Sequence, residues 1–160
     1  MLTFLNLEAE GFCSIESLHL QLNPTCTILI KAPNGKGKST ILSSLVWAIY
    51  GKNLKGVSEV NTWKQVRPKD YKGTRVQVYF QKDSHTYKII RCQKYEGVLD
   101  DGAKGKDRLI FMKDGDIVDI KGKGKIQDFI NREIGLSYTL FMNSIMFGPV
   151  SYTHLTLPTN

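Results

Sequence analysis

Cysteine is scarce in this chain. The three cysteines, Cys13, Cys26 and Cys92, are widely spaced and odd in number. This pattern argues against a disulfide framework and favours a reducing compartment. The sequence also has no CxxC pair and no cluster of histidine with cysteine, so it predicts no zinc site.

Long apolar runs are absent as well. No segment approaches the roughly 20 apolar residues that a membrane-spanning helix needs. The N-terminal residues do not form a basic region followed by an apolar core, which a secretory signal would show. We therefore expect a cytoplasmic protein with no membrane partner.

Acidic residues are outnumbered by basic ones. The 160 residues include 22 Lys and Arg against 15 Asp and Glu, which gives a formal net charge of +7. This balance favours a polyanionic partner, either nucleic acid or a nucleotide, although charge alone leaves a solubilising surface equally open. The length and the 41% of hydrophobic residues suffice for one domain with its own core.

The most informative feature that is present is a phosphate-binding loop. Residues 32–40 read APNGKGKST, which matches the G-x-x-x-x-G-K-[ST] motif except that Ala32 replaces the first glycine. The apolar, β-branched run from Thr27 to Ile30 predicts a buried strand before the loop. One helical stripe behind the loop contains Ile41, Leu42, Leu45, Val46 and Ile49. Strand, loop and helix together predict that the protein binds a nucleoside triphosphate.

The residue types in the loop suit phosphate chemistry. Gly35 and Gly37 allow positive φ and bring backbone N–H groups close to phosphates, which a residue with a Cβ does less readily. Lys38 can place its ammonium on the β- and γ-phosphate oxygens. The Ser39 hydroxyl suits Mg²⁺, and Thr40 opens a helix whose N-terminus attracts anions. The expected cofactors are therefore ATP and Mg²⁺.

Alternating apolar residues predict strands on both sides of the loop and its helix. Residues 5–9 and 18–22 alternate in this way, and two hairpins follow further along the chain. The hairpins pair residues 75–80 with 87–92, and 109–112 with 117–120 across an Asp-Gly turn. Gly51 is expected to cap the phosphate-loop helix.

Between these elements the chain is polar. Residues 52–70 are expected to form an irregular excursion in which Trp63 packs against the protein, with stacking on a nucleic-acid base as the alternative. Residues 94–108 are expected to be a mobile charged loop. The Lys/Gly run at 121–125 is interpreted as a basic hinge, with contact to a DNA backbone as the alternative. Helical spacing follows over residues 126–134.

These motifs together resemble a known family. Gly11-Phe12-x-Ser14, the loop at residues 34–40 and the segment from Leu136 to Gly148 are similar to the N-terminal half of the ATPase head of SMC-like DNA-repair proteins, the SbcC group. Residues 61–91 look closest to phage-encoded versions, the ATPase subunits of recombination exonucleases. The resemblance implies an α/β fold, a P-loop NTPase of the ABC type with a mixed sheet and β-hairpins. For a phage protein, the expected location is the host cytoplasm.

The resemblance also implies roles for the loop. Asn34 would face the γ-phosphate, and Gly35, Lys36 and Gly37 would supply N–H donors. Lys38 would be the catalytic lysine that neutralises phosphate charge. Ser39 would hold Mg²⁺ and Thr40 would touch the α-phosphate.

Larger partners follow from the same resemblance. The intact protein would dimerise through its heads, bind DNA and control a nuclease subunit of the SbcD type. The alternatives are a chromosome-organising SMC protein or a gap-repair ATPase without a nuclease, and a non-enzymatic DNA-binding module.

The chain departs from this pattern at several points. Cys13 stands where relatives have an arginine near the phosphates, and Pro149 stands where a glutamine is expected. No hydrophobic strand ending in Asp-Glu and no signature segment is present. We therefore expect residues 1–148 to be the N-terminal lobe of a head that does not turn over ATP alone. Residues 149–160 are expected to be a non-native or truncated tail.

Overall fold

The first two strands form a hairpin, as their alternating apolar residues predict. In the computed structural model, which describes residues 1–22, 25, 27–31 and 33–144, β1 (Leu2–Phe12) pairs with β2 (Ile15–Gln21) in antiparallel register. Leu7 and Ala9 point into the core and are almost fully buried. A two-residue turn at Cys13 and Ser14 joins the strands.

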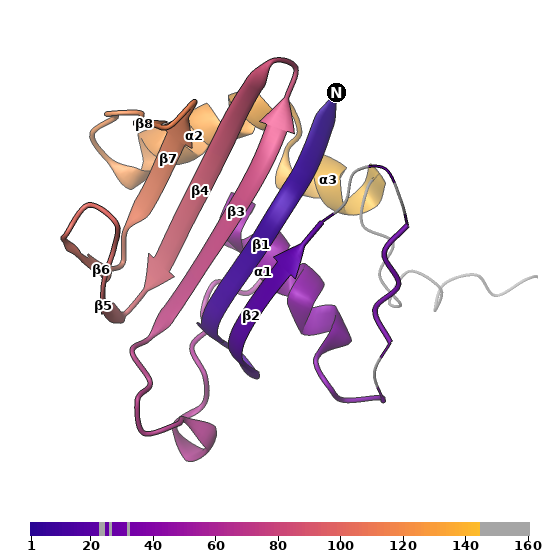
Figure 1. The fold of residues 1–160 in the computed structure, drawn as a ribbon, viewed down its shortest axis with the longest axis vertical. Coiled ribbons are helices and arrows are strands. Elements are labelled where there is room, and N and C mark those ends of the chain that lie inside the picture. The colour runs from indigo at the N-terminus through magenta and orange to yellow at the C-terminus, as the bar shows by residue number, and fades with distance from the viewer. Residues whose placement is uncertain (23–24, 26, 32, 145–160) are drawn as a thin grey trace, which may run out of the picture.

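β1 also belongs to a six-stranded sheet with the order β2-β1-β3-β4-β7-β8, in which every pair is antiparallel (Figure 1). The two hairpins expected from the sequence supply the other four strands and are confirmed. Their bounds are β3 (Thr74–Lys82) with β4 (His85–Gln93), and β7 (Leu109–Lys113) with β8 (Asp116–Ile117).

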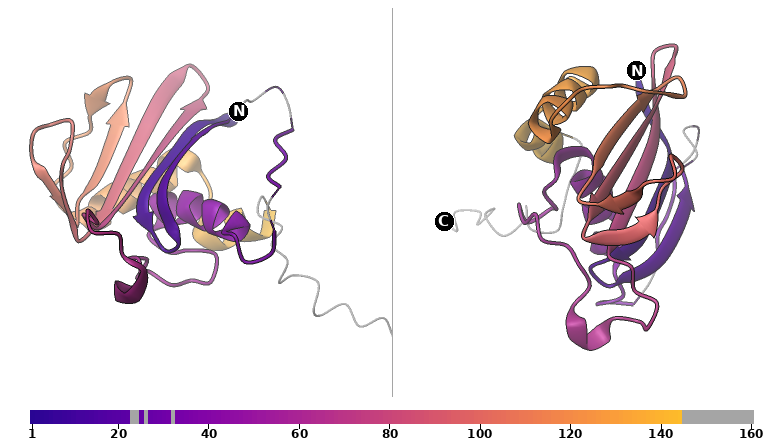
Figure 2. Two further views of the ribbon diagram at one scale, coloured as in Figure 1. Left: turned by 60° about the horizontal axis from the view of Figure 1, so that its bottom comes forward. Right: turned by 90° about the vertical axis from the view of Figure 1, so that its left-hand side faces the viewer.

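Three helices lie on one face of this sheet, as the views in Figure 2 show. They are α1 (Lys38–Tyr50), α2 (Lys123–Ile134) and α3 (Tyr138–Ser144). The main core lies between this face and the helices. Its fully buried members include Phe12, Val46, Ile49, Val76, Val78, Phe80, Ile89, Phe111, Ile130 and Phe141. None of the helices in the described ranges is long and apolar enough to cross a bilayer.

The opposite face carries a second, smaller cluster. Here β5 (Tyr95–Val98) pairs with β6 (Lys104–Lys106) and covers Ile90 of β4. The prediction of a mobile charged loop over residues 94–108 is therefore wrong. The Tyr95 hydroxyl donates to Glu10 Oε2 at 2.8 Å, and this contact between residues far apart in sequence explains why local composition did not reveal the order.

The basic run at 121–125 is not a hinge. Gly122 is the N-cap of α2, and Lys123 and Lys125 lie in its first turn. Packing of the apolar face of α2, where Ile130 and Ile134 are buried, stabilises the helix that begins at these lysines. The rest of this region is as predicted: α2 ends at Gly135, and the Ser137 hydroxyl accepts the Leu140 N–H at 3.3 Å at the start of α3.

The buried strand expected at Thr27–Ile30 is not formed. These residues have no regular structure, and Ile28 and Leu29 are exposed. A strand needs a neighbouring strand for its backbone hydrogen bonds. The hairpin's last such bond runs from the Leu22 N–H to the Leu5 carbonyl, and residues 27–30 pair with no strand within the described part of the chain.

α1 is buried at its C-terminal half. Every residue from Ser44 to Tyr50 is enclosed, whereas Leu42, which the sequence places on the apolar stripe, is 40% exposed. Gly51 ends the helix with φ 72°, and its N–H donates to the Trp47 carbonyl at 2.7 Å. The predicted cap is thus confirmed. The first turn of α1 extends beyond the core.

Arg91 of β4 holds the buried end of α1. Its guanidinium donates to the Ala48 carbonyl at 2.9 Å and to the Ile49 carbonyl at 3.1 Å, and it also bonds Gln127 of α2. A cation at a helix C-terminus interacts favourably with the helix dipole. Burial lowers the pKa of Arg91 to about 10, so the group is still charged at neutral pH. One side chain therefore joins the sheet to two helices.

Replacing Arg91 with Met should reveal the strength of this contact. The Ala48 and Ile49 carbonyls would lose a charged donor, so we expect the free energy of unfolding to fall by about 2–3 kcal/mol. Urea denaturation measures the change. Arg132→Met, at an exposed position on α2, is the matched control and should change stability by no more than about 0.5 kcal/mol. Equal losses in the two variants would contradict the role given to Arg91.

Candidate functional site

The predicted phosphate loop forms a tight turn directly before α1. Gly35 has φ 78° and Gly37 has φ 84°, which confirms the positive φ expected at both glycines. The Lys36 N–H turns back to the Pro33 carbonyl at 3.3 Å. Residues with a Cβ rarely adopt this backbone, so the local sequence determines the shape of the turn.

The N-terminus of α1 is open to an anion. Gly37 is its N-cap, no side chain caps it, and its first turn has no acidic residue. The N–H groups of Thr40 and Ile41 both donate to the Gly37 carbonyl, at 3.0 and 3.2 Å. The helix dipole places partial positive charge at this end, where a negatively charged group is stabilised.

Lys38 lies over the loop. Its Nζ donates to the Pro33 carbonyl at 2.9 Å, so the ammonium stays beside the turn instead of extending into solvent. Ser39 is exposed beside it. Two glycines with positive φ, an open helix end, a lysine and a hydroxyl form a set that fits a triphosphate with Mg²⁺.

The structure brings the predicted site residues together in one continuous segment. They are Asn34, Gly35, Lys36, Gly37, Lys38, Ser39 and Thr40. Ala32, Pro149 and the predicted tail at 149–160 lie outside the described residues. Within those residues, no cluster of His, Cys, Asp and Glu could hold a metal ion by itself.

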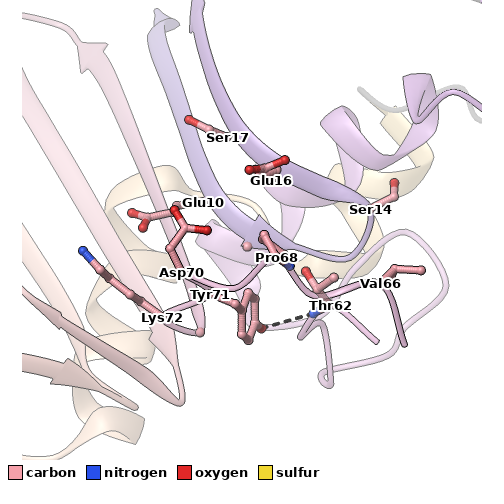
Figure 3. Close-up of a pocket in the computed structure, with 12 residues that line it drawn as sticks. Glu10, Ser14, Glu16, Ser17, Thr62, Val66, Pro68, Asp70, Tyr71 and Lys72 are labelled. Carbon is pink, nitrogen blue, oxygen red and sulfur yellow. Dashed lines mark hydrogen bonds between the residues drawn. The ribbon is translucent and has the colours of Figure 1, made fainter. Parts of the chain in front are cut away.

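The β1–β2 turn meets the loop from the sheet side. The Ser14 hydroxyl lies 3.5 Å from the position that a Cβ on Gly37 would occupy. Ser14 also lines a cavity of about 410 Å³, at the opposite end from Glu10, Asp70 and Lys72 (Figure 3). The cavity therefore adjoins the phosphate loop at Ser14, and Glu16, which follows on β2, also lines it.

A hydrogen-bond network shapes the wall of this cavity. The Tyr71 hydroxyl accepts the Thr62 N–H at 3.2 Å, the bond drawn in Figure 3, and donates to Asn61 Oδ1 at 3.0 Å. Asn61 Nδ2 in turn donates to Gln93 Oε1 at 2.9 Å. Sequence reasoning missed these residues, because they lie in an irregular segment and their partner on β4 is about 30 positions away. The one available signal was the mixture of amide and aromatic side chains in a polar stretch.

Cys13 gives the site no positive charge. Its N–H donates to the Val60 carbonyl at 2.7 Å, and burial raises the pKa of its thiol. The thiol is therefore neutral at physiological pH. The family resemblance leads to an expected arginine at this position, and the neutral thiol does not supply the cation that such an arginine would.

Comparison with known proteins identifies the family. A family model described as AAA domain matches residues 6–151. This chain belongs to the AAA domain family. The match covers the phosphate loop, the helices α1, α2 and α3, and the sheet apart from the first residues of β1.

A curated relative agrees with this assignment. Exonuclease subunit 2 of Escherichia phage RB69 is 26% identical to this chain in an alignment of 144 positions that covers 85% of the chain. The chain spans 22% of the length of that relative.

Solved structures share the fold of the AAA domain. The recombination mediator protein RecF with bound ATP is 20% identical to this chain, with a TM-score of 0.52. The match covers 78% of this chain and 30% of the RecF chain. An SMC ATPase studied for ATP-driven dimerisation and DNA-stimulated activation is 19% identical to this chain, with a TM-score of 0.52. The match covers 93% of this chain and 94% of the SMC chain. The predicted resemblance and fold class, a P-loop ATPase head, are confirmed. The sheet of the described residues is antiparallel, so its expected mixed character is not seen there.

Replacing Gly37 with Ala tests the backbone of the loop. The new Cβ would have room beside Ser14, but φ 84° is unfavourable for alanine, so we expect a loss of about 1–2 kcal/mol in stability. Gly124→Ala is the matched control, because Gly124 lies in α2 with open space around it and without positive φ. The control should be neutral or slightly stabilising. Equal urea midpoints for Gly37→Ala and wild type would contradict the strained turn.

Proposed function

We propose that this chain is the ATP- and Mg²⁺-binding lobe of an ATPase for DNA double-strand-break repair or recombination, which controls a partner nuclease at DNA ends. The observation that carries the proposal is the loop at residues 34–40, presented at the open N-terminus of α1. Its backbone, charge and hydroxyl groups suit a nucleoside triphosphate, and its context is an ATPase-head fold.

Each loop residue has a proposed role. Asn34 faces the γ-phosphate, and the N–H groups of Gly35, Lys36 and Gly37 bind phosphate oxygens. Lys38 neutralises phosphate charge and is the proposed catalytic residue. Ser39 holds Mg²⁺ and Thr40 contacts the α-phosphate. The bound metal ion would neutralise the charge that develops on the phosphates.

The nucleoside is proposed to enter the cavity beside Ser14. Phosphates held at Gly37 leave the rest of the nucleotide near the β1–β2 turn. Ser14 of this turn lies close to Gly37 and also lines the cavity. The carboxylates of Glu10, Glu16 and Asp70, which line the cavity, would repel phosphate and can accept hydrogen bonds from a sugar. The charge distribution thus favours phosphates at the loop and the uncharged end of the nucleotide in the cavity.

Partners are proposed from the relatives. The phage relative is an exonuclease subunit, which supports a nuclease partner of the SbcD type and a DNA substrate. The SMC structure was studied for ATP-driven dimerisation, which supports a homodimer through ATPase heads in the intact protein. The proposed location is the cytoplasm, which for a phage-encoded protein is that of the host.

We also propose that residues 1–148 are the N-terminal lobe and that residues 149–160 are a non-native or truncated tail. Sequencing the source DNA across this junction tests this boundary.

The fold similarity to RecF and to the SMC ATPase supports an alternative function as a second candidate. A gap-repair ATPase or a chromosome-organising SMC protein would use the same loop without a nuclease. A nuclease gene beside the source gene supports the first proposal over this one. A third possibility, a non-enzymatic DNA-binding module, would bind DNA in a salt-sensitive way that ATP does not change.

Replacing Lys38 with Ala tests nucleotide binding. The variant removes the cation from the loop, so ATP affinity should fall by about 2 kcal/mol, roughly thirtyfold. Titration with labelled ATP in the presence of Mg²⁺ measures the change. Lys36→Ala is the comparison, because it keeps the Lys36 N–H and removes only an exposed side chain, and it should lose far less. Unchanged affinity in Lys38→Ala would remove the central proposal.

A second experiment addresses turnover. A phosphate loop positions the triphosphate and Mg²⁺, but hydrolysis also needs a positioned water and stabilisation of transition-state charge. We expect the 160-residue chain to bind ATP without a useful rate of phosphate release. A steady-state phosphate assay measures this rate. Robust turnover that Lys38→Ala abolishes would show that the chain has a complete catalytic site.

A further inference from the structure

An exposed tryptophan lies within a basic segment of the chain. Residues 52–72 include six Lys or Arg and two Asp or Glu, so this segment holds +4 of the net +7. Trp63, near its middle, is 78% exposed, whereas Trp47 is 2% exposed in the core. The expectation that Trp63 packs against the protein is therefore wrong. The 3-10 helix that follows it, Lys64–Val66, projects from the molecule in both Figure 1 and Figure 2.

The backbone that presents Trp63 is braced from both sides. Arg67 Nε donates to the Thr62 carbonyl at 2.7 Å, and its guanidinium lies over the Tyr71 ring, 4.6 Å from the centroid. The Val66 N–H donates to the Trp63 carbonyl at 3.0 Å. A side chain on such a fixed support loses little backbone freedom when a ligand binds, which favours binding.

An open hollow of about 670 Å³ lies beside the indole. Its lining includes Trp63, Lys64 and Arg67 together with Glu59. The Glu59 carboxylate is engaged by Asn61 and by Lys94 Nζ at 3.5 Å, so its charge is partly neutralised. Lys64 is exposed and forms no ion pair within residues 1–22, 25, 27–31 and 33–144.

We propose that Trp63 and the basic side chains around it bind single-stranded DNA. One base stacks on the exposed indole, and the adjoining phosphates contact Lys64 and the exposed Lys69. This inference rests on the proposed function for its choice of DNA as partner, and it assigns the DNA contact to a particular surface.

The chemistry of the surface favours this occupant over others. An aromatic face beside lysine and arginine is the arrangement by which proteins bind single strands, because every base can stack and every phosphate is charged. Protein interfaces are depleted in lysine, so Lys64 beside Trp63 argues against a protein partner. Bases inside a duplex are already stacked on their neighbours, and a side chain can reach their faces only at the cost of unstacking, so binding should prefer a single strand.

The two tryptophans make the test direct. The full chain is titrated against short oligodeoxythymidylate labelled with fluorescein, whose anisotropy gives the affinity of every variant, and tryptophan fluorescence is followed in a parallel titration with unlabelled oligonucleotide. We expect quenching of the exposed Trp63 emission and none of the buried Trp47 emission, which also reports that each variant is folded. Trp63→Ala should weaken binding by about fivefold or more, and Trp63→Phe, which keeps a ring, should retain most of the affinity.

Val66→Ala is the matched control. Val66 is an apolar residue that is 64% exposed, lies in the 3-10 helix after Trp63 and has no π-face. Its variant should change affinity by less than about twofold. Oligonucleotide affinity that is equal in wild type and Trp63→Ala would overturn the inference. No binding by the wild type, or equal binding of duplex and single strand, would overturn it too.

Other outcomes separate this inference from the proposed function. ATP affinity is measured on the same samples and should be equal in wild type and Trp63→Ala. Failure of the wild type to bind ATP, with Trp63-dependent oligonucleotide binding intact, would refute the proposed ATPase function and leave this inference standing. A dimer that sedimentation detects in wild type and not in Trp63→Ala, with unchanged oligonucleotide affinity, would assign the surface to a second copy of the chain and contradict the proposal.

Discussion

Burial of the C-terminal half of α1 is the constraint on which the rest of the structure depends. Residues Ser44 to Tyr50 are enclosed between the sheet and the other helices, and Arg91 binds the last carbonyls of the helix. Apolar burial supplies most of the stability of such a helix, because propensity alone rarely maintains 13 residues. With the helix held at this end, its first turn and the glycine loop lie outside the core, and no side chain caps the helix N-terminus.

Residues within the segment 52–72 line both the cavity beside Ser14 and the hollow beside Trp63. Thr62 lines both the cavity beside Ser14 and the hollow beside Trp63. The cavity contains carboxylates and the hollow contains lysine and arginine, so the charges of the two surfaces differ. The brace formed by Arg67 and Tyr71 lies between them. This segment has little regular structure, but specific hydrogen bonds hold it in place. It places carboxylates on one face and basic side chains on the adjacent face.

Much of the fold could be predicted because its signals are local. Alternating apolar residues and an Asp-Gly turn predict the hairpin at 109–117. The positive φ at Gly37 is predicted because glycine adopts this backbone readily. The failures involve distant contacts. Thr27–Ile30 has strand composition, but a strand forms only beside another strand. The burial of Tyr95 depends on Glu10, and no local pattern indicates that Trp63 would be exposed and Trp47 enclosed.

Amide hydrogen exchange with and without ATP and Mg²⁺ tests the central claim most directly, because it reports the N–H groups that would bind the phosphates. The account predicts slower exchange on nucleotide addition at residues 34–40 and at the Ser14 turn. It also predicts little change in the buried half of α1, which is protected already. Unchanged exchange at residues 34–40 under saturating ATP, with protection appearing elsewhere, would contradict the claim that this loop is the nucleotide site.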